Sequence, residues 1–430
     1  MQPFHWFSRF TLFVGLVLIW WGAAVTTEDV GLAVPDWPLA FGKINPEGWM
    51  KVPALFLEHG HRWLATGVGF LVLVMYFWRY AKEFPREELS RMRSGWIVVF
   101  CAIGLSFFFK PIEWLLAKVL ILVSLAPEDF TWELRIAALL VQALIPLVLA
   151  LFLGLFEPTA FIFIGSCLLF LVFKGYLIPA SIIVSIGLVW LVLTWIAKKW
   201  SLLRGLTVLA LFTVIGQASL GGLRVLKMSD PYGISHGTLG QLFFCLLVFI
   251  AFASSKTWHG ESLVIQKGRG SARVLSMILF MAVFGQLVIG ATLRHTQRLY
   301  LAANDILTTK GQLFPPMNPA DVFVLHLHKY WGFSVALLVL VVAWKSRSWL
   351  GRVPRLRWIS PALLIMPINQ VVLGIYVVLT GKSFWVTNLH VLNGLGLLVL
   401  SFLLAVSVWA STAGLGLNGQ TKADKPLSST

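Results

Sequence analysis

The sequence predicts an all-α protein that crosses a membrane many times. Of its 430 residues, 58% are hydrophobic and only 12% are charged, and the mean hydropathy is +0.84. So few charged residues cannot cover a water-facing exterior, which excludes a soluble fold. In lipid, a chain satisfies its backbone only as helices or as a closed barrel, and the long unbroken apolar runs favour helices over the alternating pattern of barrel strands.

Eight apolar runs are long enough for a membrane-spanning helix, which needs about 20 residues. The predicted spans are residues 10–27, 60–79, 204–225, 235–255, 274–293, 325–344, 359–380 and 387–409.

Four further apolar runs, and a shorter one at 114–126, lie in the stretch 96–200. Basic residues flank this stretch on both sides, so we expect both flanks to face the cytoplasm and an even number of crossings to lie between them. The prediction is therefore about twelve transmembrane helices, with both termini cytoplasmic. The polar tail 411–430 is predicted to be disordered.

The charge is strongly basic, with 34 Lys and Arg against 18 Asp and Glu. In a soluble protein this balance would suggest nucleic acid as a partner. Here the basic residues gather in short connections between apolar runs, as expected for loops that face an anionic cytoplasmic leaflet. We therefore expect membrane lipid, and no nucleic acid, as the partner of these charges. The three cysteines all lie inside apolar runs without a CxxC motif, so the sequence indicates neither a disulfide framework nor a zinc site.

Two sets of motifs repeat once the stretch 96–200 is set aside. The first set comprises Asp36-x5-Gly42, His61, Gln217-x3-Gly221 and His236, and the second comprises Asp305-x5-Gly311, His328, Gln370-x3-Gly374 and His390. The repeat predicts two pseudo-symmetric four-helix bundles. Residues 1–95 with 201–260 would form the first bundle and residues 261–410 the second, with about four extra transmembrane helices inserted at 96–200.

Each predicted half carries two histidines, His61 with His236 and His328 with His390. With the N-terminus inside, all four helices run from outside to inside and begin close to their histidine, so we expect the imidazoles at one depth near the outer surface. Ionisable side chains in a membrane are costly and usually face the bundle interior. Two facing imidazoles suit the axial positions of a haem iron, which predicts one haem site in each half.

For any single histidine near a helix end, the alternative is an interfacial residue with a satisfied hydrogen bond. Four histidines at repeated positions argue against this alternative for the set. Zinc would normally draw in cysteine or carboxylate ligands, and only Glu58 is close. His59 and His326 lie two residues before the ligand candidates, so on a helix they are expected to point away from them.

Glu58 distinguishes the two halves, because the equivalent residue in the second half is Leu325. On a helix it shares a face with His61, three residues later. A carboxylate beside one metal site and absent from its duplicate predicts that one site does chemistry and the other transfers electrons. The alternative is a first-turn acid that the helix dipole stabilises.

Four cations near the outer ends of the predicted helices are candidate partners for haem propionates, and interfacial snorkelling is the alternative. They are Arg62, Arg224, Arg294 and Lys329.

Taken together, these motifs resemble those of the heme A synthase family of cytochrome oxidase assembly. The matching residues are Gly31-Leu-Ala-Val-Pro-Asp36-Trp37-Pro38, Glu58-x-x-His61-Arg62, Gln217-x3-Gly221-Gly222-Leu-Arg224, His236, Gln286-x3-Gly290-x3-Arg294-His295, His328-Lys329 and His390. The resemblance covers about residues 8–85 and 200–410.

The resemblance implies a membrane oxidoreductase that oxidises the C8 methyl of heme O to a formyl group, giving heme A for cytochrome oxidase. His61 and His236 would hold the substrate haem, with Glu58 as the catalytic carboxylate. His328 and His390 would ligate a haem b that carries electrons away. The implied location is the bacterial plasma membrane, and the expected partners are heme O, heme O synthase and further copies of the chain.

Three features depart from the family pattern. Lys329 stands where arginine is common, the first outer loop has no cysteine pair, and the stretch 96–200 has no counterpart among eight helices. Two other functions fit part of the pattern. A di-haem b-type membrane electron carrier would use the same histidines without Glu58, and a twelve-helix transporter would follow from helix number and duplication alone.

Overall fold

The computed structural model describes residues 2–83, 200–260, 269–296, 305–308, 311–314, 320–350 and 355–412. By compactness the chain divides into one unit of residues 1–75 with 205–430 and a second of residues 76–204.

Eight described helices are long and apolar enough to cross a membrane, and they confirm the eight predicted spans. They are α1 (Gln2–Thr27), α2 (Pro53–Glu83), α8 (Leu202–Lys227), α9 (Asp230–Ala253), α11 (Arg269–His295), α12 (Ala320–Leu350), α13 (Ile359–Leu379) and α14 (Phe384–Thr412). The shorter elements are the 3₁₀-helix η1 (Trp49–Lys51) and α10 (Lys256–Gly260). The four predicted helices of the stretch 96–200 and the predicted tail lie outside the described residues, so the total of twelve remains a prediction.

Local sequence signals explain where helices begin. α9 starts at Asp230, and Pro231 follows in its first turn. Proline suits this turn because its missing N–H has no helical partner there, and an acidic side chain is stabilised by the positive end of the helix dipole.

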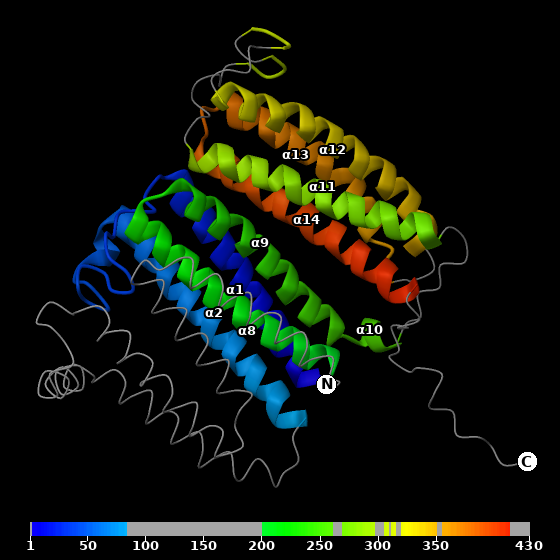
Figure 1. Cartoon of the computed structure of the whole chain (residues 1–430), viewed down its shortest axis with the longest axis horizontal. Coiled ribbons are helices and arrows are strands. Elements are labelled where there is room, and N and C mark those ends of the chain that lie inside the picture. Colours follow the sequence, from blue (N-terminus) through cyan, green and yellow to red (C-terminus); the bar gives the residue numbers. More distant parts are fainter. Residues whose placement is uncertain are drawn as a thin grey trace, which may run out of the picture. The chain divides into compact units, whose positions relative to one another are not determined.

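The four helices α11 to α14 pack in a ring, in which each helix contacts the next and α14 returns to α11 (Figure 1). Their shared core includes one fully buried side chain from each helix: Leu279, Val339, Leu363 and Leu398. In such a ring, α12 and α14 lie on one diagonal, so side chains on these two helices can meet at the centre.

Helices α1 and α9, with α2 up to Met75 and α8 from Gly205, belong to the same compact unit. Glycines mediate several of their contacts: Gly60 of α2 lies against Trp21 of α1, and Gly69 of α2 lies near Val214 of α8. α1 and α9 also pack on each other, and both contact α14. The pseudo-symmetry between the two groups of helices remains a prediction.

In the second unit, side chains join the end of α2 to the residues around the start of α8. Arg79 forms an ion pair with Glu83 at 2.8 Å, and Ser201 donates a hydrogen bond to the same carboxylate. The guanidinium of Arg204 stacks on the ring of Trp200, 4.7 Å from its centroid. The two flanks of the stretch 84–199 are therefore tied directly to each other.

Candidate functional site

The structure brings the four predicted histidine ligands together as two pairs. The ring centroids of His61 and His236 are 6.4 Å apart, with an interplanar angle of 85°. Those of His328 and His390 are 6.5 Å apart, with an angle of 62°. The second pair faces across the diagonal of the ring from α12 and α14.

Both separations suit two axial ligands of one iron. A metal–imidazole bond is about 2 Å long and its nitrogen lies about 1 Å from the ring centre, so imidazoles on opposite sides of a metal have centroids about 6 Å apart. In the described part of the chain, no three or more His, Cys, Asp or Glu side chains form a group that could hold a metal ion. Two imidazoles at this separation are a set that could hold a haem iron.

The histidines lie deeper in their helices than the sequence suggested. His61 and His328 are the ninth residues of α2 and α12, and His236 and His390 are the seventh residues of α9 and α14. The expectation that each helix begins close to its histidine is thus wrong by about one to two turns. The residues that extend α2 and α12 are mostly apolar, but Glu58, His59 and His326 separate them from the longer apolar runs that follow.

A glycine on the preceding helix faces each histidine. A Cβ built on any of these glycines would lie 2.9–3.2 Å from Cε1 of the ring, well inside the usual contact distance of about 3.5–4 Å. The pairs are Gly22 with His61, Gly221 with His236, Gly290 with His328 and Gly374 with His390. The absent side chain lets each imidazole lie directly on its neighbouring helix.

One turn before the glycine, a glutamine contacts the histidine in three of the four cases. The amide nitrogen lies 3.1 Å from Nδ1 of His328 and 3.2 Å from Nε2 of His390, and 3.1 Å from Nδ1 of His236 in the orientation that satisfies both amide ends. The glutamines are Gln286, Gln370 and Gln217 respectively. Such contacts orient a ligand ring and set its tautomer. The sequence analysis noted these glutamines only as repeat markers and did not foresee this role.

His61 is the exception. The residue four positions before Gly22 is Leu18, and Nδ1 of His61 is buried without a hydrogen bond in the described residues. The first pair therefore holds one of its rings less firmly than the second pair does.

Glu58 is buried beside the first pair, with 4% of its surface exposed. Its Oε2 accepts a hydrogen bond from the backbone N–H of Val34 at 2.7 Å, and its Oε1 forms an ion pair with Arg62 at 2.7 Å. The corresponding residue beside the second pair, Leu325, is 5% exposed. At this pair of equivalent positions, the first histidine pair therefore has a buried carboxylate beside it and the second has a leucine.

Arg62 ties the loop between α1 and α2 to α2. Its guanidinium donates to the carbonyl oxygens of Asp36, Leu39 and Val34 at 2.7, 3.0 and 3.1 Å. Asp36 in turn accepts hydrogen bonds at 2.7 Å from the N–H groups of Phe41 and Gly42. Gly42 has a φ of 72°, a left-handed conformation that glycine adopts without strain.

Lys329 does the same for the loop between α11 and α12. Its Nζ donates to the carbonyl oxygens of Asp305 and Thr308 at 2.6 and 2.8 Å, the positions equivalent to Asp36 and Leu39. The carboxylate of Asp305 accepts from the N–H of Gly311 at 2.6 Å, where φ is 74°. Both cations were predicted as propionate partners, and loop carbonyls already engage them here, so that role remains a prediction.

Arg294 and Arg224, the other two predicted propionate partners, differ in their contacts with the protein. Arg294 on α11 donates to the Ala23 carbonyl and to the Thr27 hydroxyl of α1. Arg224 on α8 lies against Gly31, with a distance of 3.0 Å between Nη2 and the Cβ position. Its Nε also lies 3.2 Å from the Cβ position of Gly233 on α9, and within the described residues the guanidinium of Arg224 makes no hydrogen bond or close ion pair.

The remaining outer histidines have protein contacts of their own. His59 accepts a hydrogen bond from Trp63 Nε1 at 3.1 Å, and His326 stacks on Tyr330 with centroids 4.3 Å apart. His295, which fell outside the repeat, lies in the same region as the first pair, with Nδ1 2.8 Å from the Cβ position of Gly233 on α9.

Comparison with known proteins decides the family. The family model of cytochrome oxidase assembly proteins, COX15-CtaA, matches residues 178–402, more than half of the chain. The chain belongs to this family. The matched range contains His236, His328 and His390. Glu58 and His61 precede its first residue and lie outside it.

Several similar proteins are bacterial heme A synthases. The heme A synthase of Shouchella clausii is 28% identical over 288 residues, covering 56% of this chain and 93% of that protein. That of Halalkalibacterium halodurans is 28% identical over 212 residues, covering 46% and 67%, and that of Erythrobacter litoralis is 30% identical over 237 residues, covering 50% and 66%. These similarities confirm that the sequence motifs of this chain resemble those of the heme A synthase family.

Proposed function

We propose that this protein is a heme A synthase, a membrane oxidoreductase that converts heme O to heme A. The observation that carries the proposal is the pairing of the histidines at the separation of axial haem ligands, with a buried carboxylate beside one pair only. Membership of the cytochrome oxidase assembly family supports it.

The proposed reaction turns the C8 methyl of the substrate into a formyl group. With the oxygen atom taken from water, R–CH₃ and H₂O give R–CHO, four protons and four electrons. The protein must therefore hold the ring in one orientation, accept protons near the methyl group and lead electrons away.

In this proposal, His61 and His236 hold the substrate heme O and Glu58 accepts protons. General-base catalysis requires a carboxylate in a water-poor site close to the reacting group, and the burial of Glu58 beside His61 meets the first requirement. The loose His61 ring, with no glutamine partner, suits a ligand that must release its haem as product.

His328 and His390 hold a resident haem b in the same proposal. A bound haem b supplies one-electron transfer, and a cofactor that stays in place needs fixed ligands. Gln286 and Gln370 supply that fixation from both sides. Arg224 is the foremost candidate for a propionate, with Arg294, Arg62 and Lys329 as further candidates.

The proposed setting is the bacterial plasma membrane, with both termini cytoplasmic. The N-terminal half, residues 1–95 and 201–260, would form the substrate site, and residues 261–410 the haem b site, while the inserted stretch 96–200 is assigned no chemical role. Heme O synthase as the donor of substrate, and assembly into a homo-oligomer, belong to the same proposal.

The Glu58→Gln variant tests the function. It keeps the shape of the side chain and one acceptor oxygen and removes its charge and basicity, so heme A formation should fall at least about 100-fold, while haem b at His328 and His390 remains. The measurement is extraction of pigments from the purified protein and chromatographic separation of hemes B, O and A.

Glu28→Gln is the matched control, because Glu28 is an exposed carboxylate at the outer end of α1, and it should convert heme O normally. Unchanged conversion by Glu58→Gln would remove the catalytic assignment. A protein that contains only heme B would instead be a di-haem b-type electron carrier.

A further inference from the structure

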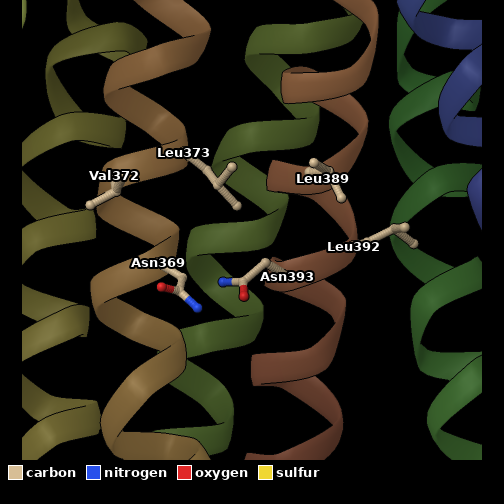
Figure 2. Close-up of a pocket in the computed structure, with 6 residues that line it drawn as sticks. All are labelled: Asn369, Val372, Leu373, Leu389, Leu392 and Asn393. Carbon is tan, nitrogen blue, oxygen red and sulfur yellow. The ribbon is translucent and has the colours of Figure 1, made fainter.

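A groove of about 450 Å³ runs between α13 and α14. Figure 2 shows its lining, with three residues from each helix: Asn369, Val372 and Leu373 of α13, and Leu389, Leu392 and Asn393 of α14. The leucine and valine side chains make its walls apolar, and the two asparagines place amide groups at one end.

The amide of Asn369 lies where a polar group is costly. Asn369 is the central residue of α13, which has 21 residues, and at about 1.5 Å per residue it lies about 15 Å from either end of the span. That depth is the middle of a hydrocarbon core about 30 Å thick. Asn369 is exposed and makes no hydrogen bond within the described residues, so lipid tails would leave its amide unsatisfied at a cost of about 1–3 kcal/mol.

A chain of hydrogen bonds leads from the groove to the second histidine pair. Asn393 donates to Oε1 of Gln370 at 2.7 Å, and the amide nitrogen of Gln370 lies 3.2 Å from Nε2 of His390. One lining residue of the groove is thus two hydrogen bonds from a predicted haem b ligand.

Neither asparagine has a counterpart at the first pair. The residue before Gln217 is Gly216 rather than asparagine, and the residue three positions after His236 is Leu239. The amide-lined groove is therefore specific to the side of the molecule where electrons would leave.

The chemistry of this groove restricts its occupant. Ester carbonyls of phospholipids lie at the interface, too far from Asn369 to accept its N–H. A quinone has an apolar ring that can reside in the hydrocarbon core and two carbonyl oxygens that accept hydrogen bonds. It also accepts electrons, which the oxidation of a methyl group requires.

We propose that the groove between α13 and α14 binds the head of a membrane quinone, with Asn369 donating to one of its carbonyls, and that this quinone accepts the electrons delivered to the His328–His390 site. The inference rests on the proposed function. Each quinone takes up two electrons and two protons, so R–CH₃, H₂O and two quinones give R–CHO and two quinols, which balances the reaction.

Photolabelling tests the site independently of turnover. The purified full-length protein in lipid nanodiscs is treated with an azidoquinone, with and without excess decylubiquinone, and labelled peptides are located by mass spectrometry. We expect label on residues 369–373 and 389–393 that decylubiquinone prevents. Label confined to other helices, or label that decylubiquinone does not prevent, would show that the groove does not bind quinone.

Variants test the role of the amide. Asn369→Leu should weaken decylubiquinone binding about tenfold, the effect of losing one hydrogen bond of about 1.4 kcal/mol, and should slow quinone-driven reoxidation of reduced haem b by a similar factor. Asn369→Gln should recover most of both, and Ile365→Ala, an exposed position on α13 outside the groove, should match the original protein.

Haem content and the haem b spectrum separate the two hypotheses. If the protein makes heme A and binds haem b normally, but Asn369→Leu binds and reduces decylubiquinone like the original protein, the quinone site is wrong and the synthase assignment stands. If no haem is bound at all, the proposed function fails, and the photolabelling result still decides whether the groove binds quinone.

Discussion

The carboxylate of Asp36 orders the loop between α1 and α2. Partial burial raises the pKa of Asp36, but the hydrogen bonds from the N–H groups of Gly42 and Phe41, together with the charge of Arg62, outweigh it and hold this pKa below its usual value. A carboxyl whose pKa is lower in the folded state stabilises that state when it is ionised.

A pH dependence follows from this shift. The contribution of Asp36 should be fully present above the ordinary aspartate pKa of about 4 and should be lost as the pH falls through its lower folded value. Thermal unfolding of the protein and of Asp36→Asn, followed from pH 7 to pH 3, checks this. The advantage over Asp36→Asn should be constant down to about pH 5 and shrink below about pH 4; an advantage that grows towards low pH would contradict it.

Gln286 should decide how firmly the second pair holds its haem. Its amide nitrogen lies 3.1 Å from Nδ1 of His328 and 2.9 Å from the backbone oxygen of the same residue. Loss of a partner that orients a ligand typically costs about 10–100-fold in metal affinity, so Gln286→Leu should release haem b to excess apomyoglobin faster by about that factor. The reciprocal Leu18→Gln variant should slow release from the first pair, and equal release rates in all three proteins would rule the role out.

Residue roles were the least predictable part of the site. The pairing of the histidines and the asymmetric position of Glu58 could be predicted because repeats and their exceptions are visible in sequence. Arg62 and Lys329 were predicted as propionate partners because they are cations near helix ends, and that position carries no information about the loop carbonyls that fold over them. The signal was nevertheless present in the identical spacing of Asp36 to Gly42 and Asp305 to Gly311, which predicts two turns of one kind.

At the scale of helices, close packing of glycine on imidazole sets the position of each pair. In Gly290→Ala, the new Cβ would lie 3.0 Å from Cε1 of His328, so either the ring or the helix must move, at about 1–3 kcal/mol. We expect the haem b content per protein, measured from the reduced-minus-oxidised spectrum, to fall about tenfold or more. Gly285→Ala is the matched control on α11, since a Cβ there meets nothing within 4 Å; a similar loss in both variants would mean that helix glycines matter only for general packing.

Helix existence was predictable and helix length was not. A count of about 20 apolar residues located all eight described spans, since length and apolarity alone determine whether a helix can cross lipid. It began the second span at residue 60, whereas α2 begins at Pro53. Residues 53–57 are themselves apolar, but Glu58 and His59 interrupt the run and such a count stops there, so His61 lies two turns inside α2 rather than at its end.

At the scale of the molecule, α1 joins the two groups of helices. Arg294 of α11 donates to Ala23 and Thr27 of α1, and the Thr27 hydroxyl donates to Asn388 of α14 at 3.3 Å. Hydrogen bonds made by a charged donor typically contribute about 1.5–3 kcal/mol. Replacing Arg294 by Met should therefore lower the free energy of unfolding by about that amount and reduce the thermal midpoint in detergent.

Arg347→Met is the control for Arg294→Met. Arg347 is exposed and its guanidinium stacks on Trp344, 4.5 Å from the ring centroid, so its loss should change the midpoint little. A larger effect for Arg347→Met than for Arg294→Met would show that this junction contributes little to stability.

The meeting of the two flanks of residues 84–199 has a consequence for the history of the gene. Since Glu83 and Ser201 already contact each other, a few residues would suffice to link α2 to α8, and segments are gained or lost most readily where chain ends lie close together. An ancestor with the shorter connection could have acquired the longer one in a single event without rearranging either histidine pair, and a descendant could discard it just as simply.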